Sequence, residues 1–263
     1  MSSTGASDAP FQLLQACIDP DGSGDIRILV GRTTIKYIVF DSGVFDAEDL
    51  SFEPSLLSIL PPLPEGDWNE AVVSHDPKTG SASFSRAHKV ELAGIDQLWH
   101  PLVVDYLDLR IGKKLRSNVY EAESNTHRSS VIAKFARFSW EVPLLEAETR
   151  AYQRIQGHGV GPEFLGHITE HGRAIGFIMT NVAGAHAAPK DLARCRRVLQ
   201  RLHGLGLKHG DINRHNFLVS GDTATLIDFD CVSPAPDDDL KKELQSLEDS
   251  LADESGRGGV STL

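Results

Sequence analysis

The sequence HGDINRHNFLV, which begins at His209, gathers side chains that could do chemistry just ahead of an apolar run. Three interpretations of it are open. His209, Asp211 and His215 could form part of a zinc site, although the sequence offers no second pair of ligands to complete it. The same stretch could be a polar turn without chemistry. The third interpretation is a catalytic loop, which needs partner residues further along the chain.

A second acidic motif, LIDFD, places Asp228 twelve residues after Asn216. Phosphoryl transfer needs magnesium held at the phosphates, and a carboxylate that orients the attacking hydroxyl and accepts its proton. Magnesium prefers oxygen ligands, of which one or two come from protein carboxylates. Asp211, Asn216 and Asp228 supply these groups, so the two motifs together favour a catalytic loop over the zinc site and the turn.

The paired motifs resemble the catalytic loop and the metal-binding Asp-Phe-Gly of protein-kinase-like phosphotransferases. HGD in place of His-Arg-Asp is the form seen in aminoglycoside and choline kinases, in lipopolysaccharide kinases and in the smallest atypical protein kinases. Residues 98–255 as a whole are similar to small stand-alone kinase-like proteins of filamentous fungi. The resemblance implies ATP and Mg²⁺ as cofactors.

The resemblance also implies a role for each residue of the two motifs. Asp211 would be the catalytic base, and Asn216 and Asp228 would hold magnesium. His209 would hold the loop through hydrogen bonds, and Gly210 would let the backbone bend.

A kinase-like fold also needs a lysine on its third strand that reaches the α- and β-phosphates. The sequence SVIAKFARF, residues 130–138, places Lys134 in the middle of a predicted strand. Alternation puts it on one face with Ile132, Ala136 and Phe138. An edge strand would also explain a lysine here, because charges on edges discourage aggregation. The downstream motifs favour the phosphate role.

That lysine needs a glutamate on the next helix, predicted over residues 142–156. Helical periodicity predicts an inward face made of Leu144, Leu145, Glu148, Ala151, Tyr152 and Ile155. Glu146 falls on the outer face with Arg150, where an exposed i,i+4 pair explains it. A glutamate on the apolar face must find a partner, because an unpaired buried charge is costly. We therefore expect Glu148 to pair with Lys134.

The predicted strand AIGFIMTNV, residues 174–182, leads into the segment that binds adenine in the family. By resemblance Met179 is the gatekeeper, and the carbonyl of Thr180 and the amide of Val182 would bind the base. Leu218 would form the floor of the pocket. Met179 and Leu218 would equally be explained as core residues.

The chain departs from the family at the glycine-rich loop, which should precede NVYEAE. The sequence there is IGKKLRSNVYEA, in which Gly112 is the one glycine available for ATP binding. Ser117 and Asn118 stand where small flexible residues are expected. The sequence therefore does not predict a glycine-rich loop whose backbone amides cover the phosphates.

The end of the sequence departs from the family as well. Asp230 replaces the glycine of Asp-Phe-Gly, which argues against the flipping switch of regulated protein kinases. The 35 residues after Asp228 contain no Ala-Pro-Glu and predict a minimal C-lobe without a peptide-binding platform. The sequence does not separate a protein acceptor from a small-molecule acceptor.

The composition of the chain limits the partners that it can bind. The 263 residues carry a net charge of −11, which argues against a nucleic-acid partner because phosphate binding needs a basic surface. Part of the acidity lies in the segment after residue 236, where the pattern predicts a helix with a solvated face over residues 237–251.

Three widely spaced cysteines form no disulfide framework. No apolar run is long enough for a membrane span and no signal peptide is evident, so a cytoplasmic or nuclear protein is expected.

We predict an α+β protein with a bilobal protein-kinase-like fold, a minimal C-lobe and an N-terminal β-rich extension. The predicted parts are a disordered tail (1–10), the β-rich extension (11–97), the kinase-like domain (98–255, divided into an N-lobe of about 98–182 and a C-lobe of about 183–255), and a flexible tail (256–263). Other predicted elements are two strands within 25–40, a loop at 53–68, a hairpin at 71–86, a helix at 189–206 and a strand at 223–230.

The predicted function is Mg-ATP-dependent transfer of the γ-phosphoryl group to a hydroxyl of a protein Ser or Thr or of a small molecule. The alternative is a weak or inactive pseudokinase that serves as a nucleotide-binding or scaffolding module. The degenerate glycine loop favours the alternative, whereas the intact Lys134, Asp211, Asn216 and Asp228 oppose it.

Overall fold

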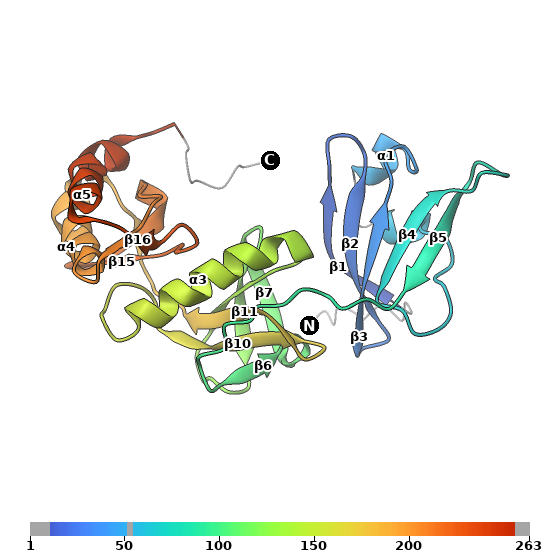
Figure 1. Cartoon of the computed structure of the whole chain (residues 1–263), viewed down its shortest axis with the longest axis horizontal. Coiled ribbons are helices and arrows are strands. Elements are labelled where there is room, and N and C mark those ends of the chain that lie inside the picture. Colours follow the sequence, from blue (N-terminus) through green and yellow to red (C-terminus); the bar gives the residue numbers. More distant parts are fainter. Residues whose placement is uncertain (1–10, 52–54, 256–263) are drawn as a thin grey trace, which may run out of the picture. The chain divides into compact units, whose positions relative to one another are not determined.

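The computed structural model describes residues 11–51 and 55–255, which form two compact units (Figure 1). The first unit extends to Leu92 and the second begins at Ala93. Ile95 belongs to the second unit, because it is buried in that unit's core and its amide donates to the carbonyl of Ala174 at 2.8 Å. The tails expected at 1–10 and 256–263 lie outside the described residues.

The first unit is a five-stranded sheet in the order β1-β2-β3-β4-β5. Its strands are β1 (Phe11–Ile18), β2 (Gly24–Val30), β3 (Thr34–Phe40), β4 (Glu70–His75) and β5 (Ala82–His88). All neighbours are antiparallel except β3 and β4. A parallel pair needs a long connection, and this one carries the short helices α1 (Ala47–Leu50) and α2 (Leu56–Ile59).

The segment expected to be a loop at 53–68 is therefore partly helical, which corrects that prediction. Leu56 of α2 is fully buried, and Trp68 is buried as well, with its Nε1 donating to the carbonyl of Pro64 at 2.8 Å. The prolines suggested an irregular loop, but the apolar residues between them fill the core beneath the sheet.

The second unit contains a six-stranded sheet in the order β6-β10-β11-β9-β8-β7. Its strands are β6 (Val103–Asp105), β7 (Leu109–Arg116), β8 (Val119–Ser124), β9 (Val131–Phe135), β10 (Phe164–Glu170) and β11 (Arg173–Thr180). A 3-10 turn, η2 (Tyr106–Asp108), links β6 to β7. Every residue of β9 is buried, so Lys134 sits inside the sheet rather than at an edge.

Helix α3 (Val142–Ile155) comes directly after the short turn η3 (Ser139–Glu141) and lies along this sheet (Figure 1). A proline occupies its first turn, where no amide partner is lost. The periodicity prediction is correct for Leu145, Glu148 and Tyr152, which are buried. It is wrong for Leu144, whose exposed fraction is 52%, because this residue lies on the outer side of the first turn.

The rest of the second unit holds two longer helices and several short strands. These elements are β12 (Ala185–His186), η4 (Pro189–Asp191), α4 (Leu192–His203), β13 (Leu207–Lys208), η5 (Arg214–Asn216), β14 (Phe217–Ser220), β15 (Thr223–Leu226), β16 (Ser233–Pro234) and α5 (Asp237–Ala252). Helices α4 and α5 lie side by side (Figure 1). The strand predicted at 223–230 ends at Leu226, because the chain turns sharply at Asp228.

Helix α5 is not simply a solvated acidic face, as its composition suggests. Leu240, Glu243, Leu247 and Leu251 are all buried and form one stripe along it. Within the described residues, no helix is long and apolar enough to cross a membrane.

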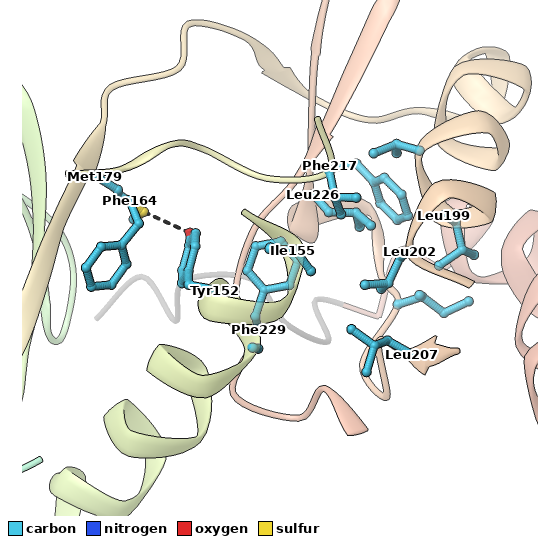
Figure 2. Packing of buried hydrophobic residues seen from close by; sticks show 14 of the residues in the cluster. Tyr152, Ile155, Phe164, Met179, Leu199, Leu202, Leu207, Phe217, Leu226 and Phe229 are labelled. Carbon is cyan, nitrogen blue, oxygen red and sulfur yellow. Dashed lines mark hydrogen bonds between the residues drawn. The ribbon is translucent and has the colours of Figure 1, made fainter. Parts of the chain in front are cut away.

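One hydrophobic core runs through the second unit, from the six-stranded sheet to α4 and α5. Tyr152 of α3 lies near the middle, where its hydroxyl donates to the sulfur of Met179 at 3.0 Å (Figure 2). Phe229 packs edge-on against Tyr152, with ring centroids 5.1 Å apart. The motif that carries Asp228 is therefore anchored in the core by its aromatic residue.

Candidate active site

A lysine and two carboxylates meet at one wall of a cavity in the second unit. The Nζ atom of Lys134, on β9, lies 2.6 Å from Oε2 of Glu148, on α3, and 2.5 Å from Oδ1 of Asp228, which comes after β15. Glu148 is 1% exposed, so its charge needs this partner. The ion pair expected from the helix periodicity is present.

The three charges shift one another's protonation. Burial alone would lower the pKa of Lys134, but the carboxylates of Glu148 and Asp228 raise it above its ordinary value. Burial favours the protonated form of Asp228, yet Lys134 and Arg116 hold its pKa below its ordinary value. Lys134 and Asp228 are therefore both charged at neutral pH.

The backbone around Asp228 is held in an uncommon conformation. Its φ is 68°, a left-handed value that costs a non-glycine residue free energy and persists where the surroundings enforce it. Two contacts do so: the amide of Ile227 donates to the carbonyl of Asn216 at 3.0 Å, and the amide of Phe229 donates to Glu148 Oε1 at 3.3 Å. The turn buries Phe229 and leaves the Asp228 side chain lining the cavity.

The loop of the HGD motif is organised around Asp211. Asn213 and Asn216 donate from their Nδ2 atoms to Asp211 Oδ2, at 3.1 and 3.2 Å, and Asn216 also donates to the Asp211 carbonyl at 2.9 Å. Gly210 has a φ of 85°, and a Cβ there would lie 2.6 Å from the carbonyl oxygen of Cys231. The loop thus needs glycine at this position, and its two asparagines fix the carboxylate.

His209 is fully buried beside Phe229, and each of its ring nitrogens has a hydrogen-bond partner. Its Nε2 lies 3.2 Å from the carbonyl of Ile227, and the amide of Asp211 donates to its Nδ1 at 3.4 Å. Burial lowers the pKa of His209, which matches a neutral ring that donates from one nitrogen and accepts at the other. Both nitrogens are occupied, so the zinc interpretation is excluded for His209.

Glu243 of α5 is a site residue that the sequence analysis missed. Its Oε2 accepts from the amide of His209 at 3.0 Å, and its Oε1 accepts from the amide of Gly210 at 2.8 Å. His203 Nε2 lies 2.8 Å from the same carboxylate. Burial opposes the charge, but these hydrogen bonds hold the pKa of Glu243 below its ordinary value. The sequence did contain a signal for Glu243, because its position falls on the apolar stripe of α5.

The residues expected to hold magnesium fit that ion. Asp228 brings a charged carboxylate, and the backbone bond between Ile227 and Asn216 places the two motifs side by side. Oδ1 of Asn216 is buried and makes no hydrogen bond, although its amide nitrogen makes two. A buried oxygen without a donor is suited to a hard cation.

Beside these charges lies a largely apolar cavity of about 300 Å³. Of the residues expected to contact adenine, Met179, Thr180, Val182 and Leu218 all line it, together with Ile132 of β9. Its size and lining are those of a pocket for a small ligand. Lys134, Glu148 and Asp228 close its polar end.

Gly112 is not among the residues that line this cavity. It lies in the exposed middle of β7, and a Cβ there would meet the carbonyl of Glu121 at 3.1 Å. The supposed glycine-rich loop is instead a strand and a tight turn at Ser117 and Asn118. The residue of β7 that reaches the cavity with its charge is Arg116.

Glu146 also differs from its expected role. It pairs with Arg150 at 2.8 Å as predicted, but its side chain is only 16% exposed. Its Oε2 accepts from the amides of Asp96 and Gln97, at 2.8 and 3.3 Å. Glu146 therefore fastens the segment before β6 onto α3, which an exposed helix pair would not do.

The comparisons with known proteins support a kinase-like protein. The model of the lipopolysaccharide kinase (Kdo/WaaP) family matches residues 181–257, which are less than a third of the chain. The matched segment includes the HGD loop, the Asp228 motif and α5 with Glu243. No curated protein matches the chain.

Proposed function

We propose that the second unit binds Mg-ATP and transfers the γ-phosphoryl group to a hydroxyl. The observation that carries the proposal is the position of Lys134, bonded to both Glu148 and Asp228 at the polar end of an apolar cavity. Burying charge is costly, and groups in a cleft whose pKa values are shifted by a specific charged partner are candidates for a functional site.

In this proposal the cavity binds adenine through Met179, Thr180, Val182 and Leu218. Lys134 then points to the α- and β-phosphates, and Glu148 keeps it in place. Because the Lys134 ammonium group is held in place before the reaction, the site needs less reorganisation when charge develops during phosphoryl transfer.

Asn216 and Asp228 are the proposed magnesium ligands. When bound there, the ion would neutralise charge on the β- and γ-phosphates. Asn216 is poised for this because its side-chain nitrogen is fixed by Asp211, which aims the free Oδ1 atom.

Asp211 is the proposed catalytic base. The acceptor oxygen forms a bond to the γ-phosphorus, its proton passes to the Asp211 carboxylate, and the bond from phosphorus to the ADP oxygen breaks. Asn213 and Asn216 hold one carboxylate oxygen at 3.1 and 3.2 Å, so the Asp211 side chain is oriented before the acceptor arrives.

The proposal includes a bilobal arrangement and a domain division. The six-stranded sheet with α3 would be the N-lobe, up to about residue 182, and the part from about 183 to 255 would be the minimal C-lobe. The likeness to fungal stand-alone kinases belongs to the same proposal. The proposed acceptor is a compound that carries a hydroxyl group, either a protein Ser or Thr or a small molecule.

The test is ATP turnover and autophosphorylation by the purified full chain, compared with Asp211→Ala. Wild type should hydrolyse or transfer phosphate in the presence of magnesium. Asp211→Ala should bind ATP within a few-fold of wild type and lose on the order of a hundredfold in rate. Equal rates would remove Asp211 from the mechanism. ATP binding without any turnover in wild type would support the pseudokinase module instead.

A further inference from the structure

Arg116 is the one arginine side chain that the described structure sends into the nucleotide cavity. It stands at the end of β7, directly before the turn at Ser117 and Asn118. Its NH1 atom lies 3.0 Å from Asp228 Oδ2, and its NH2 atom donates to the carbonyl of His215 at 3.4 Å. The residue therefore bridges the turn above the cavity to both catalytic motifs.

The turn itself is too short and too firmly held to wrap phosphates with its backbone. Arg116 pairs directly with Val119, which leaves two residues between the strands. The carbonyl of Asn118 accepts from the amide of Phe135 at 3.1 Å, and the carbonyl of Ser117 accepts from the hydroxyl of Tyr120 at 3.2 Å. A glycine-rich loop works through free amides on a pliable backbone. Both carbonyls of this turn are hydrogen-bonded and neither of its two residues is glycine, so its backbone is not pliable in that way.

Arg116 has the chemistry to replace those amides. A guanidinium donates several hydrogen bonds in a planar fork that matches phosphate oxygens. Its side chain is 26% exposed and lines the cavity, so it is accessible to a ligand there. Both oxygens of Asp228 contact cationic side chains, Oδ1 that of Lys134 and Oδ2 that of Arg116.

We propose that Arg116 is a phosphate-binding residue, which exchanges its contact with Asp228 for the nucleotide phosphates when ATP binds. This inference rests on the proposed function. A divalent cation at Asp228 repels the guanidinium, and the phosphates offer it a new anionic partner. The exchange releases Asp228 Oδ2 for the metal at the moment when the phosphates need a counter-charge.

Because of this exchange, replacing Arg116 should lower the affinity for ATP and raise the affinity for a divalent metal. Replacing a residue with a purely structural role would not change the two affinities in opposite directions. Replacing Arg116 removes a phosphate contact, so affinity for ATP falls. It also removes the cation that competes for Asp228, so affinity for a divalent metal alone rises. Lys134 still balances Asp228 in the variant, which keeps the site folded.

The test measures binding of adenosine, ADP, ATP and Mn²⁺ to the full chain by calorimetry and Mn²⁺ paramagnetic resonance. Arg116→Ala should bind Mg-ATP about tenfold to a hundredfold more weakly, as expected for losing charge-assisted bonds. Adenosine affinity should stay within about twofold, because adenosine has no phosphate. Mn²⁺ alone should bind several-fold more tightly. Arg116→Lys, which keeps the charge but not the fork, should lie between.

Arg110 provides the matched control, since it lies on the same strand and pairs with Glu123 on the surface, 83% exposed. Arg110→Ala should leave all four affinities unchanged. Equal ATP affinity in Arg116→Ala and Arg110→Ala would overturn the inference, as would an equal loss for adenosine and ATP. Failure of the proposed function gives a different result: wild type then binds neither ATP, ADP nor adenosine. If only the inference on Arg116 fails, wild type binds ATP and Arg116→Ala binds it equally well.

Discussion

The carboxylate of Glu243 accepts a hydrogen bond from the amide of Gly210 at 2.8 Å, which fastens α5 to the loop that carries Asp211. A second bond, from the amide of His209, makes the attachment bidentate. The backbone of the loop that carries Asp211 is thus held by a residue some thirty positions later in the chain.

Removing this carboxylate should destabilise the protein. Glu243→Ala leaves the buried amide of His209, the part-buried amide of Gly210 and His203 without their acceptor, so we expect a loss of about 3 kcal/mol in the free energy of unfolding. Urea unfolding measures it. Glu248→Ala, at an exposed position of the same helix, should change stability by less than about 0.5 kcal/mol. Similar values for the two variants would show that the loop does not depend on Glu243.

Glu243 should also make stability depend on pH. Its folded-state pKa is depressed below the ordinary 4.5, so the folded state binds its proton less readily than the unfolded state does. The stability that Glu243 contributes is fully present above pH 4.5 and is lost as the pH falls through the depressed value. The stability gap between wild type and Glu243→Gln should therefore narrow on acidification below 4.5. A gap that stays constant in unfolding curves across that range would contradict this.

Magnesium should couple to nucleotide binding through Asp228. ATP should raise the melting temperature of wild type modestly without magnesium and clearly with it, because a ligand that binds only the folded state stabilises it. Asp228→Asn should abolish the magnesium-dependent part of the shift, and thermal melting with and without EDTA measures this. Asp230→Asn, two residues on, is the control and should keep it. The absence of any shift in wild type would remove the basis of the kinase proposal.

The pairing of Lys134 with Glu148 could be predicted because two independent periodicities met there. Strand alternation placed the lysine among apolar residues, and helix periodicity placed the glutamate inward. The same logic applied to α5 would have found Glu243, but its acidic neighbours suggested a solvated face. The prediction that Leu144 faces inward was wrong, because a residue in the first turn of a helix can face solvent without loss of packing.

Other features had no signal in the sequence. Arg116 lies in LRIGKKLR, where one glycine and several charges suggested a loop rather than the strand β7. Its contact with Asp228 joins residues 112 positions apart, which only the folded sheet brings together. The left-handed backbone of Asp228 is likewise set by tertiary hydrogen bonds to Asn216 and Glu148, since nothing in its own residue type requires it.

The last prediction separates the two glutamates of α3. Glu148→Gln removes the buried charge that anchors Lys134, while the amide oxygen can still accept from Phe229. Activity should fall about tenfold or more through loss of a charge-assisted bond, with a smaller effect on folding. Initial rates at saturating and limiting ATP measure the effect, and KM for ATP should rise because Lys134 is less well placed.

Glu146→Gln is the matched variant on the same helix, and the structure changes what should be expected of it. An exposed pair with Arg150 alone would contribute a few tenths of a kcal/mol. Because Glu146 also accepts from Asp96 and Gln97, the variant should cost about 1 kcal/mol of stability and leave the rate intact. A variant of Glu146 that lost activity as strongly as Glu148→Gln would mean that α3 acts on the site through its packing and not through the Lys134 ion pair.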